Sequence, residues 1–217
     1  LTKQITVSFG QRATYTDNRE LFMNSNALQL IERSRLTSAF ASIREFGFFV
    51  NGSFKTGGNS ALRPYFVLTN GDGGNVFNKD FGGLKIGGRL DFLPFGTFTN
   101  FGQFRQADVM RELTPKFVIG AVFSKNYGMS SRRGRESGAI LYLDANNEES
   151  LPDFTKFGID FLFKYRGFSA LGEFVKTAAT VPTDITQRVR TNGTTATDFL
   201  VNNVQDVENY VKGRMML

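Results

Sequence analysis

Alternation of polar and apolar residues with a period of two constrains this chain more than any other feature. In the segment Thr155–Tyr165 almost every second residue is large and apolar, and most of the residues between them are polar. The apolar set is Phe157, Ile159, Phe161 and Phe163, and the polar set includes Lys156, Asp160 and Lys164. Successive side chains of a β-strand point to opposite faces, whereas a helix needs a period of 3.6. The segment is therefore predicted to be a strand with one apolar and one polar face.

The same period indicates further strands along the whole chain. They are Lys3–Phe9, Glu45–Phe54, Ala61–Thr69, Gly83–Leu93, Phe117–Phe123, Phe168–Thr177 and Tyr210–Leu217. Their lengths of roughly 7–12 residues lie near the 9–11 that a tilted strand needs to cross a bilayer. Arg166-Gly167 predicts a two-residue hairpin turn that places Tyr165 opposite Phe168, on the same face.

The connections between these strands alternate in length. Gln11–Ser42, Lys125–Asp153 and Ala178–Asn209 are long, whereas Lys55–Ser60 and Arg166-Gly167 are short. Long loops at one end and tight turns at the other are typical of an outer-membrane β-barrel. Pro94–Pro115 departs from this layout, because it is long and falls at the end where turns should be short.

A soluble β-sandwich is the alternative, because it also alternates, with its apolar face in the core. Two features favour the membrane barrel. The apolar faces consist mainly of Phe, Ile and Leu, which would crowd a core about 10 Å thick. The polar faces combine charges with small residues such as Gly87 and Gly158. We therefore predict an all-β fold, in which residues 1–217 form one partial outer-membrane domain. This is an antiparallel transmembrane β-barrel with about eight strands in this chain.

Composition removes several classes of function. The 217 residues contain no Cys and no His, which excludes disulfides, thiolate chemistry, imidazole bases and His-ligated metals. We expect no enzyme activity, no cofactor and no metal site. The net charge is +6, but the basic residues are dispersed, which disfavours nucleic acid as a partner. No apolar run of about 18 residues predicts a transmembrane helix. No signal peptide is visible, and the chain reads as processed or incomplete.

Four segments, in this order, resemble the phosphate-selective porin O and P family of outer-membrane porins, particularly its Bacteroidota-type members. They are Leu30-Ile31-Glu32-Arg33-Ser34, Arg44-Glu45-Phe46-Gly47, Arg111–Lys116 and Phe163–Ser169. The resemblance implies a sixteen-stranded barrel, usually trimeric, with an inward-folded loop and basic residues along the pore. This chain would supply about the middle half of it. No Arg-x-Arg-x-Arg run is present, so phosphate selectivity is not implied.

Basic residues on the polar strand faces are the first candidate site. They are Lys85, Arg89, Lys156, Lys164 and Arg63. If these side chains line a lumen, their positive charge attracts anions. In the alternative interpretation they pair with Asp91, Asp160 and Glu173 on the same faces and only solvate the wall.

Two loop clusters are the other candidates. Arg132, Arg133 and Arg135 suit phosphate groups of a solute or of lipopolysaccharide, because guanidinium binds phosphate bidentately; the alternative is a solvated loop tip. Glu32, Arg33 and Arg35 would form a constriction if the first long loop folds inward, and otherwise an ordinary extracellular loop.

We therefore expect an outer-membrane porin of a Gram-negative cell that passes small anionic solutes by diffusion. Its partners would be membrane lipid, lipopolysaccharide, small anions and further copies in a homotrimer. The alternative is a non-conducting barrel subunit of a barrel-assembly or secretion complex. In either case Phe157, Ile159, Phe161 and Phe163 would face lipid.

Overall fold

The computed structural model describes residues 4–41, 44–71, 83–129, 141–189 and 193–216. The strands are β1 (Ile5–Arg12), β2 (Glu45–Gly52), β3 (Phe54–Gly57), β4 (Ser60–Thr69), β5 (Lys85–Leu93), β6 (Lys116–Asn126), β7 (Leu141–Leu143), β8 (Asp153–Tyr165), β9 (Phe168–Thr180), β10 (Gln187–Val189), β11 (Thr195–Ala196), β12 (Leu200–Val201) and β13 (Val204–Gln205). The helices are α1 (Arg19–Phe22), α2 (Arg35–Phe40) and α3 (Val207–Met216), with short 3-10 segments η1 (Ser25–Ala27) and η2 (Thr99–Phe104).

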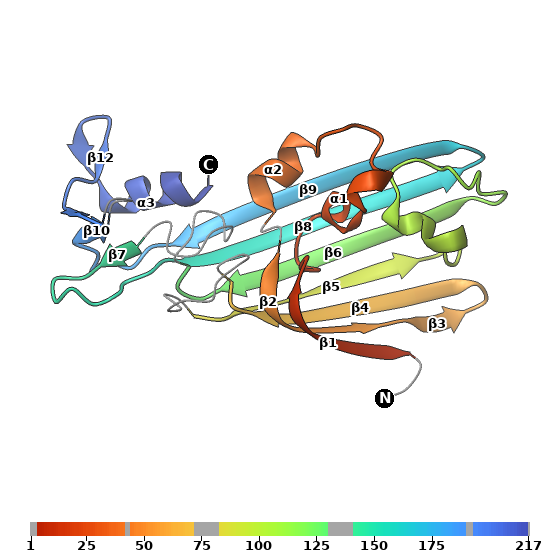
Figure 1. Cartoon of the computed structure of the whole chain (residues 1–217), viewed down its shortest axis with the longest axis horizontal. Coiled ribbons are helices and arrows are strands. Elements are labelled where there is room, and N and C mark those ends of the chain that lie inside the picture. The colour runs from red at the N-terminus through yellow and green to blue at the C-terminus, as the bar shows by residue number, and fades with distance from the viewer. Residues whose placement is uncertain (1–3, 42–43, 72–82, 130–140, 190–192, 217) are drawn as a thin grey trace.

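One antiparallel sheet of eight strands dominates the molecule (Figure 1). Its strands follow the chain in the order β1-β2-β4-β5-β6-β8-β9, and β3 pairs with β4. The predicted antiparallel, all-β class is confirmed. The sheet is open in the described residues, where β1 and β9 form its two edges, so the predicted closed barrel is not formed by this part of the chain alone.

The predicted hairpin turn between β8 and β9 is confirmed. Tyr165 is the partner of Phe168 in the ladder. Arg166 and Gly167 both adopt positive φ values, of 48° and 94°. Two consecutive positive φ angles are characteristic of the type I′ turn, whose twist matches that of the strands.

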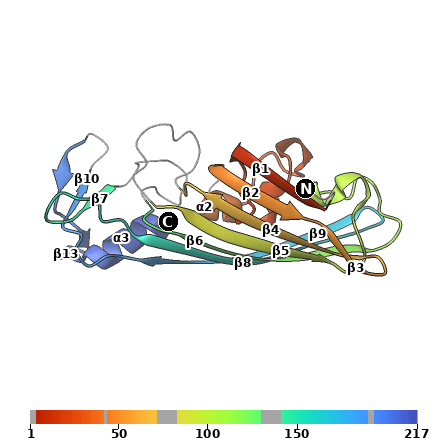
Figure 2. The same cartoon turned by 90° about the horizontal axis from the view of Figure 1, so that it is seen from below.

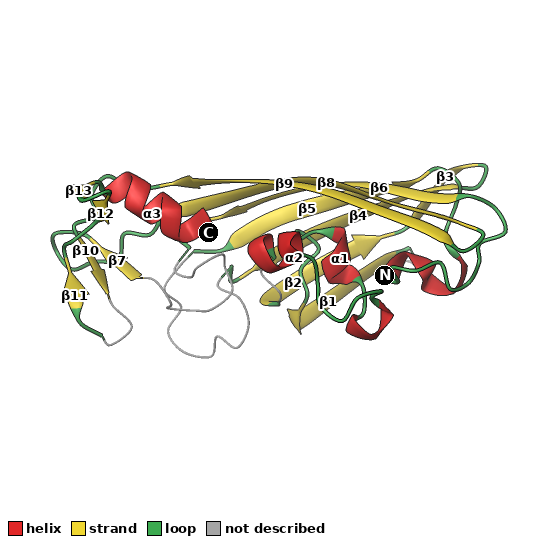
Figure 3. Ribbon diagram, turned by 90° about the horizontal axis from the view of Figure 1, so that it is seen from above, coloured by secondary structure: helices red, strands yellow, loops and turns green. Residues whose placement is uncertain are grey.

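The two faces of this curved sheet differ sharply (Figures 2 and 3). On the convex face, apolar residues from neighbouring strands form continuous, largely exposed rows. One such row joins half-buried Leu62 with exposed Phe92, Ile119 and Phe161, which are successive partners across β4, β5, β6 and β8. Phe157, Ile159 and Phe161 are all exposed on this face, and Phe163 is half-buried. No other described segment covers these rings.

The concave face is covered by two connections. In the segment 13–44, the described residues 13–41, with α1 and α2, lie over the middle of the sheet. The segment 94–115, with η2, lies over the end with the short turns (Figure 1). Beneath the second segment is a hydrophobic cluster of Met23, Ala61, Leu93, Phe98, Val118 and Leu162. The long Pro94–Pro115 connection therefore has a structural reason: it folds back over the concave face.

A second apolar cluster lies at the opposite end, where β8 and β9 continue beyond their neighbours. It joins Met129, Tyr142, Phe154, Ile185, Phe199 and Val211. The predicted strand Tyr210–Leu217 is wrong, because Val207–Met216 forms α3. Asp206 caps this helix by accepting a hydrogen bond from the Asn209 N–H at 3.0 Å. Among the described residues, no helix has the length and apolar character to cross a membrane.

The facing of β8 predicts unequal effects of truncating two neighbouring residues. Leu162 is 0% exposed in the concave-face cluster, whereas Phe161 is 39% exposed on the convex face. Leu162→Ala is expected to lower the free energy of unfolding by about 2–5 kcal/mol, because it leaves a cavity. Phe161→Ala, the matched control, is expected to cost less although it removes more atoms. Urea titration of both variants measures the difference, and a larger loss for Phe161→Ala would contradict the assigned facing.

Candidate functional site

The candidate site is the contact between the inward-folded segment 13–44 and the concave face of the sheet. The segment leaves β1 at the end with the long loops and crosses the face toward the end with the short turns. There the Asn24 N–H donates to the Phe104 carbonyl, and the Gln106 N–H donates to the Ala27 carbonyl. The two covering segments therefore hold each other as well as the sheet.

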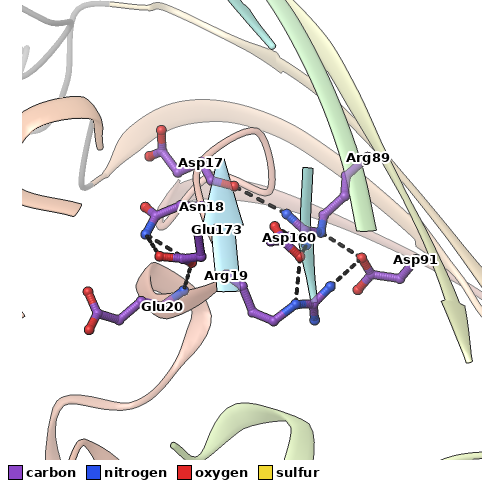
Figure 4. A network of polar contacts seen from close by, with 8 residues as sticks. All are labelled: Asp17, Asn18, Arg19, Glu20, Arg89, Asp91, Asp160 and Glu173. Carbon is purple, nitrogen blue, oxygen red and sulfur yellow. Dashed lines mark hydrogen bonds and ion pairs between the residues drawn. The ribbon is translucent and has the colours of Figure 1, made fainter. Parts of the chain in front are cut away.

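Arg19, in α1, makes the central contact with the sheet (Figure 4). Its Nη2 lies 2.8 Å from Asp91 Oδ1 on β5, and its Nε lies 2.6 Å from Asp160 Oδ1 on β8. Arg89 on β5 binds the same two carboxylates, with Nε 2.8 Å from Asp91 and Nη2 2.6 Å from Asp160 Oδ2. All four side chains are at least nine-tenths buried. Two guanidinium groups thus neutralise two carboxylates, and one member of this quartet comes from the inward segment.

Two further buried ion pairs lie beside this quartet. Lys156 Nζ on β8 is 2.5 Å from Asp17 Oδ1 and also donates to the Phe40 carbonyl at 2.6 Å. Lys85 Nζ on β5 is 2.7 Å from Glu45 Oε1 on β2. Together with the quartet, four basic and four acidic side chains balance one another.

Glu173 on β9 holds the backbone of the same segment. Its carboxylate accepts from the Glu20 N–H at 2.8 Å and from Asn18 Nδ2 at 3.0 Å. Contacts from Asp17, Asn18, Arg19 and Glu20 therefore reach β5, β8 and β9, so four consecutive residues fasten the segment across the sheet.

Two glycines make room for this contact. A Cβ on Gly120 would lie 2.4 Å from both Arg89 Nη2 and Asp91 Oδ1, and 2.7 Å from Arg19 Nη2. A Cβ on Gly87 would lie 2.6 Å from the Thr16 methyl group of the inward segment. Any larger residue at either position would have to displace the segment or the ion pairs.

The basic residues predicted to line the lumen all lie on the concave face, but they are engaged there. Lys85, Arg89 and Lys156 are buried in ion pairs. Lys164 donates to the carbonyls of Gly102, Arg105 and Ala107, at 2.7–2.9 Å, and so holds the 94–115 segment. Arg63 is only half-buried. The alternative interpretation named Asp91, Asp160 and Glu173 as partners. Arg89 pairs with the first two, whereas Lys85 and Lys156 pair with Glu45 and Asp17, and Glu173 binds the inward segment instead.

The predicted constriction residues lie in the inward-folded segment, where they have different surroundings. Glu32 and Arg35 are exposed. Arg33 donates to the carbonyls of Glu20 and Met23, the latter at 2.9 Å, and so stabilises the turn that follows α1. Arg132, Arg133 and Arg135 lie outside the described residues.

Glu20 organises the inner part of the segment. Its carboxylate accepts from the Ser34 N–H and Ser34 Oγ at 2.8 Å, from the Thr37 hydroxyl, and from Gln106 Nε2 at 2.8 Å. Burial by itself would raise the pKa of Glu20. The hydrogen bonds from Thr37 and Ser34 and the charge of Arg33 outweigh burial, and the pKa lies below its usual range.

The residues of the segment that make these contacts were not predicted from the sequence: Asp17, Asn18, Arg19 and Glu20. Each has an ordinary polar side chain in a long connection, and no period identifies it. The available signal was indirect. Several strands carry charged residues on the face opposite their apolar face. If that charged face is covered, the buried charges require partners from elsewhere in the chain.

Comparison of the chain with protein-family models, with curated proteins and with solved structures finds no match. The geometry of the sheet and of its covered face is therefore the evidence for function.

Removal of the Arg19 charge tests the central contact. In Arg19→Gln, two buried carboxylates share one guanidinium, which is expected to cost about 3–5 kcal/mol because a buried pair is broken. Amide hydrogen exchange in residues 13–23 should accelerate strongly. Arg35→Gln is the control, because Arg35 lies on the same segment and is exposed. Similar exchange in the two variants would show that Arg19 does not hold the segment.

Acidification is expected to loosen the segment through Glu20. Its pKa is lowered in the folded state, so its contribution to stability is complete above the usual glutamate pKa of about 4.3. That contribution is lost as the pH falls through the lower, folded-state pKa. Hydrogen exchange at Ser34 and Thr37 should therefore increase in this acidic range. In Glu20→Gln, these two amides should exchange faster at neutral pH, and their exchange should lose much of its pH dependence. A wild-type-like pH profile in this variant would exclude Glu20 as the titrating group.

Proposed function

We propose that this chain forms part of the wall of an outer-membrane β-barrel, and that the barrel passes small solutes by diffusion through a lumen narrowed by the segment 13–44. The observation that carries the proposal is the contrast between the two sheet faces. The convex face exposes rows of Phe, Ile and Leu, and the concave face bears a folded-in segment on buried charges.

Exposure of so much apolar surface is unfavourable in water. Large contiguous apolar patches on a protein mark contacts with a membrane or a partner. Here the exposed side chains run across strands from β1 to β9, including Phe9, Phe48, Phe66, Phe123 and Phe174. In a bilayer this face would contact acyl chains. The backbone of the edge strands β1 and β9 would then require pairing partners, so the proposal includes additional strands that close the barrel.

The arrangement supports a size-limiting channel better than a strongly anion-selective one. The four ion-paired cations and anions of the covered face cancel, so Lys85, Arg89 and Lys156 contribute little free charge to a lumen. Lys164 has no carboxylate partner at ion-pair distance among the described residues, but it is buried beneath the 94–115 segment, where it donates to backbone carbonyls. The segment 13–44 occupies space on the inner side of the wall, as the resemblance to the phosphate-selective porin O and P family leads one to expect.

A non-conducting barrel subunit of a larger outer-membrane assembly is the second candidate. It is favoured by the two segments that cover the concave face, 13–44 and 94–115, which also form hydrogen bonds with each other. Single-channel recording on the protein extracted from membranes separates the two candidates. Conductance that increases in Arg19→Gln supports the narrowed channel. Absence of conductance from the folded wild-type protein contradicts it and supports the subunit.

Placement in the membrane is tested on the convex face. Phe161→Arg is expected to cost about 2–4 kcal/mol if this residue lies near the bilayer midplane. Phe161→Leu, which keeps an apolar side chain at the same position, is the matched control. For both variants, the fraction of folded, heat-resistant protein in lipid vesicles is measured. In a water-exposed protein, Phe161→Arg would change stability by only about 0.5 kcal/mol, so equal folding of the two variants would contradict the membrane assignment.

A further inference from the structure

A cavity of about 410 Å³ lies between the end of β1, the inward segment and Phe104 of η2, apart from the buried ion pairs. Its lining contains three arginines, Arg12, Arg33 and Arg44, and no acidic residue. Pockets that bind small organic molecules have volumes of about 300–1,000 Å³. The cavity therefore has the size for an organic ligand and a lining of one charge sign.

Within the described residues, none of the three guanidinium groups has a carboxylate partner at ion-pair distance. The charge of Arg33 also acts on Glu20, whose pKa it helps to lower. Arg12 donates to Ser8 Oγ at 2.8 Å and to the Tyr15 hydroxyl at 2.6 Å, both neutral groups. Arg33 donates to backbone carbonyls. The nearest acid on β2, Glu45, is already paired with Lys85.

Arg12 is also held in place for binding. Its guanidinium lies 4.8 Å from the Tyr15 ring centroid and 5.3 Å from that of Phe49. Stacking on two rings restricts the side chain, so less conformational entropy is lost when a ligand binds. Arg44, which also lines the cavity, is in contrast an exposed residue.

The remaining lining is mainly apolar. It is formed by Leu21, Phe22, Met23, Phe104 and the Tyr15 ring, with Asn24 and Ser25 at the side. A small inorganic anion would leave these surfaces in contact with water. An anion with an attached apolar body would bury them while its charged group meets the arginines.

We propose that this cavity binds an organic anion, with its carboxylate at Arg12, Arg33 and Arg44 and its apolar body against Phe22 and Phe104. The site goes beyond the proposed function, because a conducting or a non-conducting barrel could carry it. It also differs from the site expected from the sequence, since neither Arg12 nor Arg44 was among the residues predicted to attract anions.

Fluorine NMR on the protein extracted from membranes and kept folded in detergent provides the test. The probe is 4-fluorobenzoate, and the neutral comparison compound of nearly identical shape is 4-fluorobenzamide. Protein-free micelles give the background for both. We expect the benzoate to bind saturably and at least tenfold more tightly than the amide. The reason is that about 1.4 kcal/mol of charge-assisted hydrogen bonding corresponds to a factor of ten in affinity. Inorganic phosphate should displace the probe only at much higher concentration.

Arg44→Gln is the main variant, because this exposed side chain can be replaced without disturbing a described contact. It should weaken benzoate binding roughly tenfold, and Arg12→Gln should weaken it further. Arg35→Gln, an exposed arginine of the same segment that does not line the cavity, should leave binding unchanged. Three results would overturn the proposal: no saturable binding to wild type, equal affinity for amide and benzoate, or equal losses in Arg44→Gln and Arg35→Gln. Phosphate binding as tight as that of benzoate would exclude the organic anion. Membrane insertion and conductance are measured separately, so failure here leaves the proposed function standing.

Discussion

The structure depends on one buried interaction, in which Arg19 and Arg89 share the carboxylates of Asp91 and Asp160. Transfer of any one of these charges from water is unfavourable by several kcal/mol, and only close pairing offsets it. The two carboxylates lie on different strands of the sheet. Because Arg19 belongs to a connection rather than to a strand, the same contact that neutralises the sheet also fixes the position of the segment above it.

The sheet and the segment are therefore energetically coupled. Without the segment, Lys156 would lose its partner Asp17, and Glu173 would lose the Asn18 amide and the Glu20 N–H. Without Gly120, the quartet would have no space. The segment must lie close to the sheet for these charges to pair, and the pairing in turn holds the segment there. This is expected because a buried polar network is stable only when all its groups have partners.

This coupling changes how charge on the covered face relates to function. A row of basic side chains on the inner side of a barrel suggests attraction of anions, but attraction requires charge that is not already neutralised. The ion-paired lysines and arginines serve to hold the inner segment. Positive charge without an ion-pair partner among the described residues lies instead around the cavity lined by Arg12, Arg33 and Arg44.

Local sequence determined the strands and their facing. Thr155–Tyr165 alternates so regularly that its two faces follow from chain geometry, and Arg166-Gly167 fixes the pairing of Tyr165 with Phe168 through the length of the turn. Local sequence failed at Tyr210–Leu217, because Val207, Tyr210 and Val211 have helical spacing and pack against Phe199 once Asp206 caps the helix. A short apolar run is compatible with either structure until its packing partner is known.

Only the tertiary structure decided what the polar faces do. Asp91 and Asp160 are 69 residues apart in the sequence and Arg19 is further away still, and no periodic pattern connects a residue in a loop with two residues on different strands. The reason is physical: alternation reports only which side of a strand a residue occupies, whereas the state of a charge depends on what approaches from outside the strand. The sequence by itself thus determined a two-faced antiparallel sheet, and long-range packing decided that its charged face is covered.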